Sequence, residues 1–315
     1  MKLFKVKTKD LLKVSDLTRE EIIKIFDLAQ KLKKDIKKNI THNLLEKKSL
    51  AMVFEKNSTR TRISFEVGMT QLGGHALFLK GDQIQLERGE SIADTAKVMS
   101  RYVDAIMIRT YAHQKVVELA NNTEIPVING LTDSYHPCQA LTDYFTIYEQ
   151  ERDFSKIKLA YIGDGNNIAH SLLLAGAILG AQVSIATPRK YSPDKNLVAE
   201  AKKIAIKTGA KLEVKADIKK ALQKADYLYT DVWTSMGQEK ESNKRKKELK
   251  DYKISEENLS FCSPNCQVMH CLPAHRGEEI EAEIIDSKRS IIFEQAENRL
   301  HVQKAIMSVL IFNRS

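Results

Sequence analysis

The sequence has no long apolar segment and few cysteines, and both absences narrow the class of protein. No stretch of its 315 residues approaches the roughly 18 apolar residues that a membrane-spanning helix needs. The first residues lack the apolar core of a secretory leader and the Arg- and Ser-rich pattern of an organelle leader. Four cysteines are too few for a disulfide framework in such a chain and suit a reducing compartment. We therefore expect a cytoplasmic protein with no membrane partner.

Several catalytic and cofactor motifs are also missing. The sequence contains no Gly-x-Ser-x-Gly elbow and no His-Glu-x-x-His zinc motif. The absence of Walker A glycines argues against the usual nucleotide phosphate loop. Gly163-Asp164-Gly165 follows an expected strand and partly resembles a dinucleotide-binding fingerprint, but Ile168 stands where the third glycine belongs. A nicotinamide cofactor is therefore not expected.

A late cluster of thiol and imidazole side chains does not have the spacing of a zinc site. Structural zinc sites favour two ligand pairs separated by a spacer. Here all four candidates fall within ten residues and the last two are adjacent: Cys262, Cys266, His270 and Cys271. Cys271 has two interpretations, as a thiol that contacts a ligand or as a small buried apolar residue. We expect no metal and no cofactor.

Positive charge exceeds negative charge, with 50 lysines and arginines against 41 acids and a formal net charge of +9. This excess fits nucleic-acid binding, binding of anionic small molecules, or a lysine-rich composition without a specific role. The lysines are spread widely, and no aromatic residues alternate with them as a stacking platform requires. We favour the third interpretation for most of the charge. A basic nucleic-acid-binding protein, suggested by the run at residues 244–247, stays an alternative.

Strands and helices are expected to alternate along the chain, because short apolar runs are separated by segments with apolar residues at helical spacing. Thr18 to Glu21 has the capping-box pattern and opens the first amphipathic helix. The expected strands are residues 50–54, 75–79, 104–109, 126–129, 159–162, 182–186, 227–231 and 267–272. The expected later helices are residues 61–72, 91–102, 113–120, 137–148, 168–179, 196–207 and 303–312. The alternation predicts an α/β fold of two doubly wound domains, each with a central parallel sheet flanked by helices.

Two polar segments interrupt this pattern. Residues 149–155 lie between two regularly patterned regions and are the best candidate for a domain boundary. A length of 315 residues is enough for two domains of ordinary size. Residues 237–253 are charged and are expected to form a loop with a short helix.

One segment carries the strongest signal for a ligand site. It lies where the strand at 50–54 gives way to the next helix, and it places hydroxyls and guanidinium groups in a row: Ser58, Thr59, Arg60, Thr61 and Arg62. These groups, with the backbone N–H groups of a helix N-terminus, bind phosphate or another anion. The alternative interpretation is a solvated, capped helix start.

Further polar clusters fall at or beyond the ends of expected strands, where open α/β sheets bind ligands. They are residues 85–90, 109, 136–139, 231–237 and 270–276. His136 is interpretable as a donor to a carbonyl oxygen or as a helix cap, and Arg109 as a ligand contact or a rim ion pair. Asp231 either receives a substrate ammonium or forms a turn. Asn167 can present its amide to a small ligand at the strand ends.

Together these segments resemble the ornithine carbamoyltransferase family. The resemblance rests on Ser-Thr-Arg-Thr-Arg at 58–62, His-Pro-Cys-Gln at 136–139, Asp-Val-Trp-x-Ser-Met-Gly at 231–237 and His-Cys-Leu-Pro-Ala-His-Arg-Gly at 270–277. It runs in the family's motif order from about residue 8 onward, with Gly-Asp-Gly-Asn-Asn at 163–167 and Glu-Asn-Arg at 297–299 in support. Aspartate carbamoyltransferases share the Ser-Thr-Arg-Thr and His-Pro elements but must accept a dicarboxylate and lack the Ser-Met-Gly loop. Putrescine carbamoyltransferases are closer and remain an alternative.

The resemblance implies transfer of a carbamoyl group from carbamoyl phosphate to the δ-amine of L-ornithine, without a cofactor. It implies a carbamoyl phosphate domain over residues 1–150, joined by the last helix at about 300–315, and an ornithine domain over residues 151–299. It also implies a homotrimer or a higher multiple of trimers, with each active site at a subunit contact, and no nucleic-acid partner.

The resemblance also assigns roles to single residues. Those for carbamoyl phosphate are Ser58, Thr59, Arg60, Thr61, Gln85, Arg109, His136, Gln139, Cys271, Leu272 and Arg299, with Gln85 lent by a neighbouring subunit. Those for ornithine are Asn167, Asp231, Ser235 and Met236. The catalytic set is Arg109, His136, Asp231 and Cys271. The loop at residues 235–237 is expected to close after carbamoyl phosphate binds.

Overall fold

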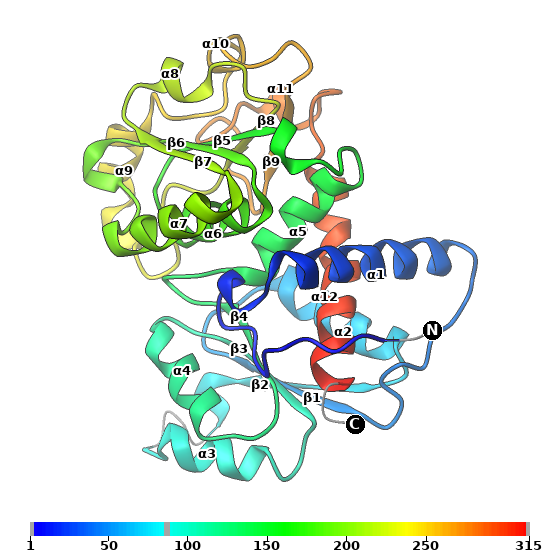
Figure 1. Ribbon diagram of the computed structural model, residues 1–315. Coiled ribbons are helices and arrows are strands. Elements are labelled where there is room, and N and C mark those ends of the chain that lie inside the picture. Colours follow the sequence, from blue (N-terminus) through cyan, green and yellow to red (C-terminus); the bar gives the residue numbers. More distant parts are fainter. Residues whose placement is uncertain (1–2, 85–88, 313–315) are drawn as a thin grey trace. The chain divides into compact units, whose positions relative to one another are not determined.

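The structure, a computed structural model, describes residues 3–84 and 89–312 (Figure 1). The chain forms two compact units: unit 1 comprises Met1–Phe145 with Asn298–Ser315, and unit 2 comprises Thr146–Glu297. Each unit has its own parallel sheet, four-stranded in unit 1 and five-stranded in unit 2. The predicted fold class is therefore confirmed. Among the residues that the structure describes, no helix combines the length and the apolar character that a membrane crossing needs.

The sheet of unit 1 has the strand order β2-β1-β3-β4. Its strands are β1 (Ser49–Phe54), β2 (His75–Lys80), β3 (Ala105–Arg109) and β4 (Val127–Leu131). All neighbouring strands are parallel. Because the chain leaves β1 first toward β2 and later toward β3, the order reverses at the β1–β3 pair. The carboxyl ends of such a pair form the crevice in which open α/β sheets bind ligands.

Helices cover both faces of this sheet (Figure 1). They are α1 (Arg19–Lys37), α2 (Thr59–Gln71), α3 (Ile92–Met99), α4 (His113–Asn121), α5 (Pro137–Tyr148) and α12 (Ile292–Phe312). Ala96 of α3 and Val116 of α4 share one buried cluster with Val53 and Ile108 of the sheet. On the other face α2 approaches α12 closely, since a Cβ at Gly68 would lie 2.9 Å from Met307 Cε. This approach brings α12 to the helix that follows β1.

The sheet of unit 2 has the order β7-β6-β5-β8-β9, again all parallel. Its strands are β5 (Lys158–Ile162), β6 (Gln182–Ala186), β7 (Lys211–Lys215), β8 (Tyr227–Thr230) and β9 (Gln267–His270). The order reverses at the β5–β8 pair. The ends of these two strands are therefore the second place in the chain where a ligand crevice is expected.

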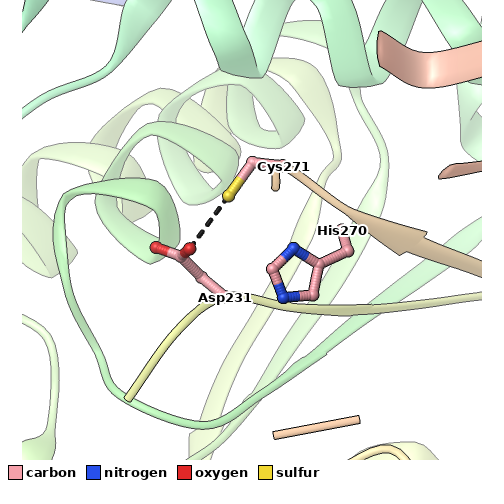
Figure 2. Close-up of side chains that lie close together, drawn as sticks. All are labelled: Asp231, His270 and Cys271. Carbon is pink, nitrogen blue, oxygen red and sulfur yellow. Dashed lines mark hydrogen bonds between the residues drawn. The ribbon is translucent and has the colours of Figure 1, made fainter. Parts of the chain in front are cut away.

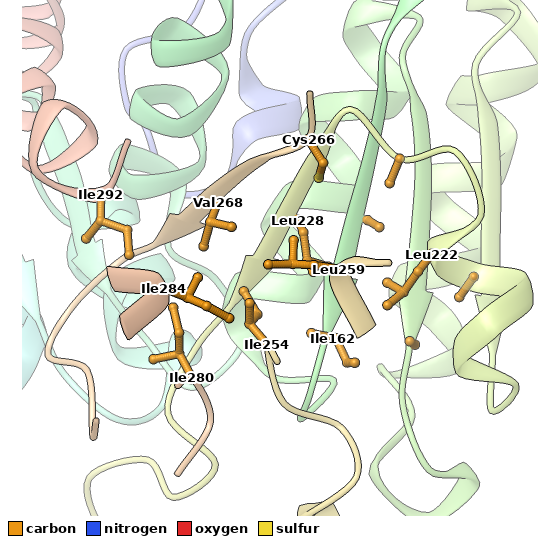
Figure 3. Packing of buried hydrophobic residues seen from close by; sticks show 14 of the residues in the cluster. Ile162, Leu222, Leu228, Ile254, Leu259, Cys266, Val268, Ile280, Ile284 and Ile292 are labelled. Atoms are coloured by element: carbon orange, nitrogen blue, oxygen red, sulfur yellow. The ribbon is translucent and has the colours of Figure 1, made fainter. Parts of the chain in front are cut away.

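Unit 2 is also covered on both faces. Helices α6 (Asn167–Leu179) and α7 (Lys195–Thr208) lie on one face (Figure 1). On the other face lie α8 (Ile218–Leu222), α10 (Glu256–Leu259) and α11 (Ala282–Ile285), over a core that includes Ile162, Leu228 and Val268 (Figure 3). A short helix, α9 (Ser242–Leu249), lies in the charged segment as predicted. This core fixes the strand ends that carry the polar residues of the site.

Several described elements differ from the sequence prediction. The short helices α8, α10 and α11 were not expected, because each spans only four or five residues, too few to show a helical period. Strand β7 was not expected, because Lys211, Glu213 and Lys215 alternate with its two apolar residues and its edge position leaves one face exposed. The last helix begins at Ile292 and not at residue 303. Its first turns carry charged and amide side chains, several of them buried, which hide the apolar pattern that sequence reasoning uses.

Candidate active site

The first turn of α2 presents the predicted anion-binding groups of unit 1. Ser58 caps the helix: its Oγ accepts from Thr61 N over 3.2 Å and donates to Thr61 Oγ1 over 3.0 Å. Thr59 is exposed and Arg60 is half-buried. Arg62 lies apart, because its guanidinium pairs with Glu66 on the surface and stacks over an aromatic ring. The motif thus supplies hydroxyls, backbone N–H groups and one arginine at the end of β1.

A single buried arginine joins this turn to α5. Arg299 of α12 donates from Nη2 to Thr61 Oγ1 and from Nη1 to Gln139 Oε1, each over 2.8 Å. The exposed fractions of Thr61, Gln139 and Arg299 are 0%, 1% and 3%, so these bonds are shielded from water. Gln139 in turn donates from Nε2 to Asp143 Oδ1 over 2.8 Å. Three helices from distant parts of the chain therefore meet in one polar network.

His136 and Arg109 lie next to this network. Arg109 is the last residue of β3 and is buried. His136 immediately precedes α5, and its carbonyl oxygen accepts from Ala140 N. Burial, together with the positive charges of Arg299 and Arg109, holds the pKa of His136 well below its usual range. The imidazole is therefore neutral at pH 7 and carries one N–H, so it can donate a hydrogen bond without adding a charge.

Unit 1 thus brings together most of the residues predicted for the phosphate donor. Contacts or close charges link Ser58, Thr61, Arg109, His136, Gln139 and Arg299. Thr59 and Arg60 belong to the same helix turn. Gln85 lies outside the described residues. Sequence reasoning missed Asp143, which looked like an ordinary polar residue within a helix.

In unit 2 a buried carboxylate occupies the β5–β8 crevice. Asp231 directly follows β8, and its Oδ2 accepts from Asn166 Nδ2 over 2.7 Å. Asn166 also caps α6, accepting from Ile168 N over 2.9 Å. Sequence reasoning chose Asn167, which is the buried first residue of α6. The preference of asparagine for the N-cap position is the signal that pointed to Asn166.

The loop before α6 needs glycine for close packing. A Cβ at Gly165 would lie 2.4 Å from Tyr191 O and Pro193 N. Gly165 N donates to Tyr191 O over 2.8 Å. The glycines that resemble a dinucleotide fingerprint therefore serve chain packing at this loop, and the loop positions Asn166.

A thiol also contacts the carboxylate of Asp231 (Figure 2). Cys271 Sγ donates to Asp231 Oδ1 over 2.9 Å, and Val232 N donates to the same oxygen over 2.8 Å. Leu272 has a left-handed backbone with φ 59°, and its N–H donates to His270 Nδ1 over 2.8 Å. Cys271 is thus buried, as the second interpretation expects, but its thiol has a polar partner; its contact with a ligand stays a prediction.

Among the residues that the structure describes, two groups of side chains have atoms close enough to share a metal ion. The donor atoms of Asp231, His270 and Cys271 lie within 4.8 Å of one another, as do those of His275, Glu278 and Glu279. Within the described part of the chain, Cys262 and Cys266 belong to neither group. The sequence cluster that was tested for zinc is therefore divided in space.

Arg245 of α9 forms hydrogen bonds that hold the segment after Asp231 in place. Arg245 donates from Nη1 to Asp164 Oδ2 over 2.8 Å and to Trp233 O over 3.2 Å. Burial raises the pKa of Asp164 to about 6, although the charge of Arg245 opposes this shift. Ser235 is half-buried and Met236 is exposed on the loop between Trp233 and α9. The basic run at 244–247 is thus partly internal, because Arg245 is buried, whereas Lys246 pairs with Glu278 at the surface.

Comparison with known proteins places this site in a family. Residues 9–149 match the domain described as "Aspartate/ornithine carbamoyltransferase, carbamoyl-P binding domain". Residues 155–310 match the domain described as "Aspartate/ornithine carbamoyltransferase, Asp/Orn binding domain". The chain belongs to the aspartate/ornithine carbamoyltransferase family. The family resemblance drawn from the sequence motifs is thereby confirmed.

Individual members of the family are similar over nearly the whole chain. An ornithine carbamoyltransferase of Bacillus thuringiensis subsp. konkukian is 53% identical, over 96% of this chain and 94% of its own length. The solved ornithine carbamoyltransferase of Pyrococcus furiosus is 50% identical with a TM-score of 0.93, over 98% of both chains. The anabolic ornithine carbamoyltransferase of Campylobacter jejuni is 41% identical with a TM-score of 0.91, over 98% of this chain and 100% of its own.

Proposed function

We propose that the protein is an ornithine carbamoyltransferase, which transfers the carbamoyl group of carbamoyl phosphate to the δ-amine of L-ornithine and yields L-citrulline and phosphate. The observation that carries the proposal is the buried carboxylate of Asp231, held by Asn166 and Cys271. A carboxylate attracts the ammonium groups of ornithine and repels the second carboxylate of aspartate. Similar proteins named ornithine carbamoyltransferase support the same choice within the family.

We assign carbamoyl phosphate to Ser58, Thr59, Arg60, Thr61, Arg109, His136, Gln139 and Arg299. The hydroxyls, N–H groups and guanidinium groups at the start of α2 suit its phosphate. Negative charge develops on the carbonyl oxygen as the amine attacks, and Arg109, neutral His136 and Thr61 are its donors. Removing one such donor commonly costs about 3–4 kcal/mol.

We assign ornithine to Asn167, Asp231, Ser235 and Met236, with Cys271 and Leu272 beside the reacting groups. A free alkylammonium has a pKa of about 10.4, so the δ-amine must lose a proton before it attacks. Asp231 orients the substrate, and Cys271 fixes Asp231 through its hydrogen bond. Because no covalent intermediate is needed, catalysis rests on positioning, which recovers roughly 7–11 kcal/mol in well-oriented reactions.

We also propose a homotrimer or a multiple of trimers, located in the cytoplasm, with Gln85 lent by a neighbouring subunit. Apolar side chains on α2 and β2 of unit 1 support an interface there: Ile63, Val67 and Leu77 are 54%, 37% and 40% exposed. Helix α2 also carries the anion-binding turn. Light scattering of the purified protein measures the mass, and a monomer at assay concentration would contradict this assembly.

An acceptor assay tests the function. Citrulline formation from carbamoyl phosphate is measured with L-ornithine, in parallel with product formation from putrescine and L-aspartate. We expect ornithine to be preferred about 10³-fold or more in kcat/KM, because a site that contacts the α-amine and α-carboxylate rejects acceptors without them. Equal rates with putrescine, or no citrulline at all, would refute the proposal.

A further inference from the structure

Gln139 lies between two side chains that together fix the orientation of its amide. Its Nε2 donates to Asp143 Oδ1 over 2.8 Å, and its Oε1 accepts from Arg299 Nη1 over 2.8 Å. An ionised carboxylate only accepts hydrogen bonds, and a guanidinium only donates them. Only one orientation of the Gln139 amide therefore satisfies both neighbours. In a flipped amide, Nε2 would face the N–H donor of Arg299 and Oε1 would face the carboxylate of Asp143, so neither hydrogen bond could form.

The cost of the flipped orientation is high because the three side chains are buried. Gln139 and Asp143 lie four residues apart on α5, so they share one face of the helix. Asp143 is fully buried, and Gln139 and Arg299 are nearly so. A buried polar atom that loses its partner has no water to replace it and bears the full desolvation penalty. Arg299 and Asp143 thus act on the two ends of one amide.

The oxygen end of this amide is the end that lies toward the anion-binding turn. Arg299, which bonds the amide oxygen through Nη1, bonds Thr61 Oγ1 through Nη2. Thr61 is in turn bonded by the cap residue Ser58. The amide nitrogen is directed to Asp143, further along α5. A carbonyl oxygen has two lone pairs, so the oxygen of Gln139 can accept a second hydrogen bond in addition to that from Arg299.

We propose that Asp143 is a positioning residue that makes this site specific for a carbamoyl group. It holds Gln139 so that an amide oxygen, and not an amide nitrogen, faces the NH2 group of carbamoyl phosphate. The proposal rests on the proposed function. Among acyl phosphates of this size, an acetyl group presents a methyl group and a carboxyl group presents an oxygen. Only the carbamoyl group offers N–H donors to an acceptor.

Two unreactive phosphonates that differ at one group test the proposal. Phosphonoacetamide carries NH2 where acetonylphosphonate carries CH3, and each is measured as an inhibitor competitive with carbamoyl phosphate. For the wild-type protein we expect phosphonoacetamide to bind about tenfold more tightly, the equivalent of one hydrogen bond. In Asp143→Leu this preference should fall to within about twofold, while the Ki of acetonylphosphonate stays within about threefold of wild type.

The comparison separates positioning from a structural role. Equal weakening of both inhibitors in Asp143→Leu would show that Asp143 only supports the fold, and an unchanged preference would show that it does not orient Gln139. Either result overturns the proposal. Because Asp143→Leu removes a buried charge near Arg299 and can fail to fold, the near-isosteric Asp143→Asn is measured in parallel. Asparagine can accept from Gln139 as aspartate does, but it can also donate to a flipped amide. We therefore expect a preference for phosphonoacetamide between those of the wild type and Asp143→Leu, and a preference below that of Asp143→Leu refutes the proposal.

A paired variant provides the rescue test. Gln139→Glu alone sets two buried carboxylates against each other and should weaken phosphonoacetamide binding more than tenfold. Adding Asp143→Asn supplies a donor to one carboxylate oxygen of Glu at position 139, while the other oxygen accepts from Arg299. The double variant should therefore recover most of the preference for phosphonoacetamide, and a double variant as poor as the single one would contradict the orientation argument.

The wild-type assay distinguishes this proposal from the proposed function. Citrulline formation together with an unaltered inhibitor preference in both Asp143 variants refutes the role of Asp143 alone. A wild-type protein that makes no citrulline refutes the function, and with it the carbamoyl specificity proposed for this site.

Discussion

Arg299 Nη2 donates a hydrogen bond to Thr61 Oγ1 over 2.8 Å, although the two residues are 238 positions apart in the chain. The same guanidinium bonds Gln139, so it holds the first turn of α2 and the first turn of α5 at once. A planar guanidinium can span two acceptors in this way, whereas the ammonium of lysine is a compact point charge. The fork of Arg299 therefore aligns residues of unit 1 that we propose bind carbamoyl phosphate.

Arg299→Lys should lower kcat/KM for carbamoyl phosphate about 100-fold, since a charged hydrogen bond in a buried site is worth roughly 1.5–3 kcal/mol. Steady-state kinetics with saturating ornithine measure the change. Arg62→Lys is the matched control, because Arg62 belongs to the same motif but pairs with Glu66 on the surface. The assignment fails if both variants lose activity equally.

Cys271→Ala should lower kcat/KM for ornithine about 10- to 100-fold while the KM for carbamoyl phosphate changes little. The thiol donates to Asp231 Oδ1, and a lost hydrogen bond to a charged group costs roughly 1.5–3 kcal/mol. Cys262→Ala, which removes a half-buried thiol elsewhere in unit 2, is the control. Turnover within a few-fold of wild type in Cys271→Ala would remove Cys271 from the catalytic set.

Arg245→Met should release α9 and raise the KM for ornithine about tenfold. Removing one partner of a buried ion pair commonly costs about 3–5 kcal/mol, and here the loss falls on the segment that carries Ser235 and Met236. Hydrogen exchange of residues 238–250 should become faster than in the wild-type protein. Lys247→Met, on the exposed face of the same helix, should leave both quantities unchanged. Unchanged exchange in Arg245→Met would contradict the prediction.

Asp164 should give the stability a pH dependence of a defined sign. Burial raises the pKa of this carboxyl from 3.8 to about 6, so between about pH 4 and pH 6 the native state holds a proton that the unfolded chain has released. The free energy of unfolding due to Asp164 therefore falls as the pH rises through this window and is level above it.

Denaturant unfolding of the wild-type protein and Asp164→Asn at several pH values measures this effect. The stability of the wild type relative to the variant should decline between about pH 4 and pH 6. Two units of pKa correspond to roughly 3 kcal/mol. A relative stability that rises with pH would show that the carboxyl is ionised throughout.

The strand ends that carry the site could be located from the sequence because buried parallel strands are short apolar runs. Phe54, Arg109 and Asp231 stand at or next to the ends of such runs, and the ends of β1, β3 and β8 lie within a residue or two of the expected positions. The strand–helix alternation then predicts the sheet class. What it cannot supply is strand order, which places the two reversals at β1–β3 and β5–β8.

Helix boundaries and contacts between distant segments could not be predicted, because a sequence pattern does not show the residue at which a helix begins or which segments pack together. The choice between Asn166 and Asn167 depends on the residue at which α6 begins, a boundary that patterns fix only within a few residues. Arg245 lies in a basic run that resembles a solvated surface, and only the packing of α9 shows that it is buried beside Asp164. The role that we propose for Asp143 likewise depends on its hydrogen bond with Gln139, one turn earlier on α5.

Arg299 is synthesised late, so its hydrogen bonds form after most of the chain has been made. Gln139 precedes Arg299 by 160 positions, and all of unit 2 is synthesised in that interval. The residues of β1, β3 and α5 are made early, yet the pocket that we propose for carbamoyl phosphate stays incomplete until α12 has left the ribosome. Tight binding of carbamoyl phosphate would therefore report that α12 has left the ribosome, and a chain stopped before α12 would hold this labile compound poorly.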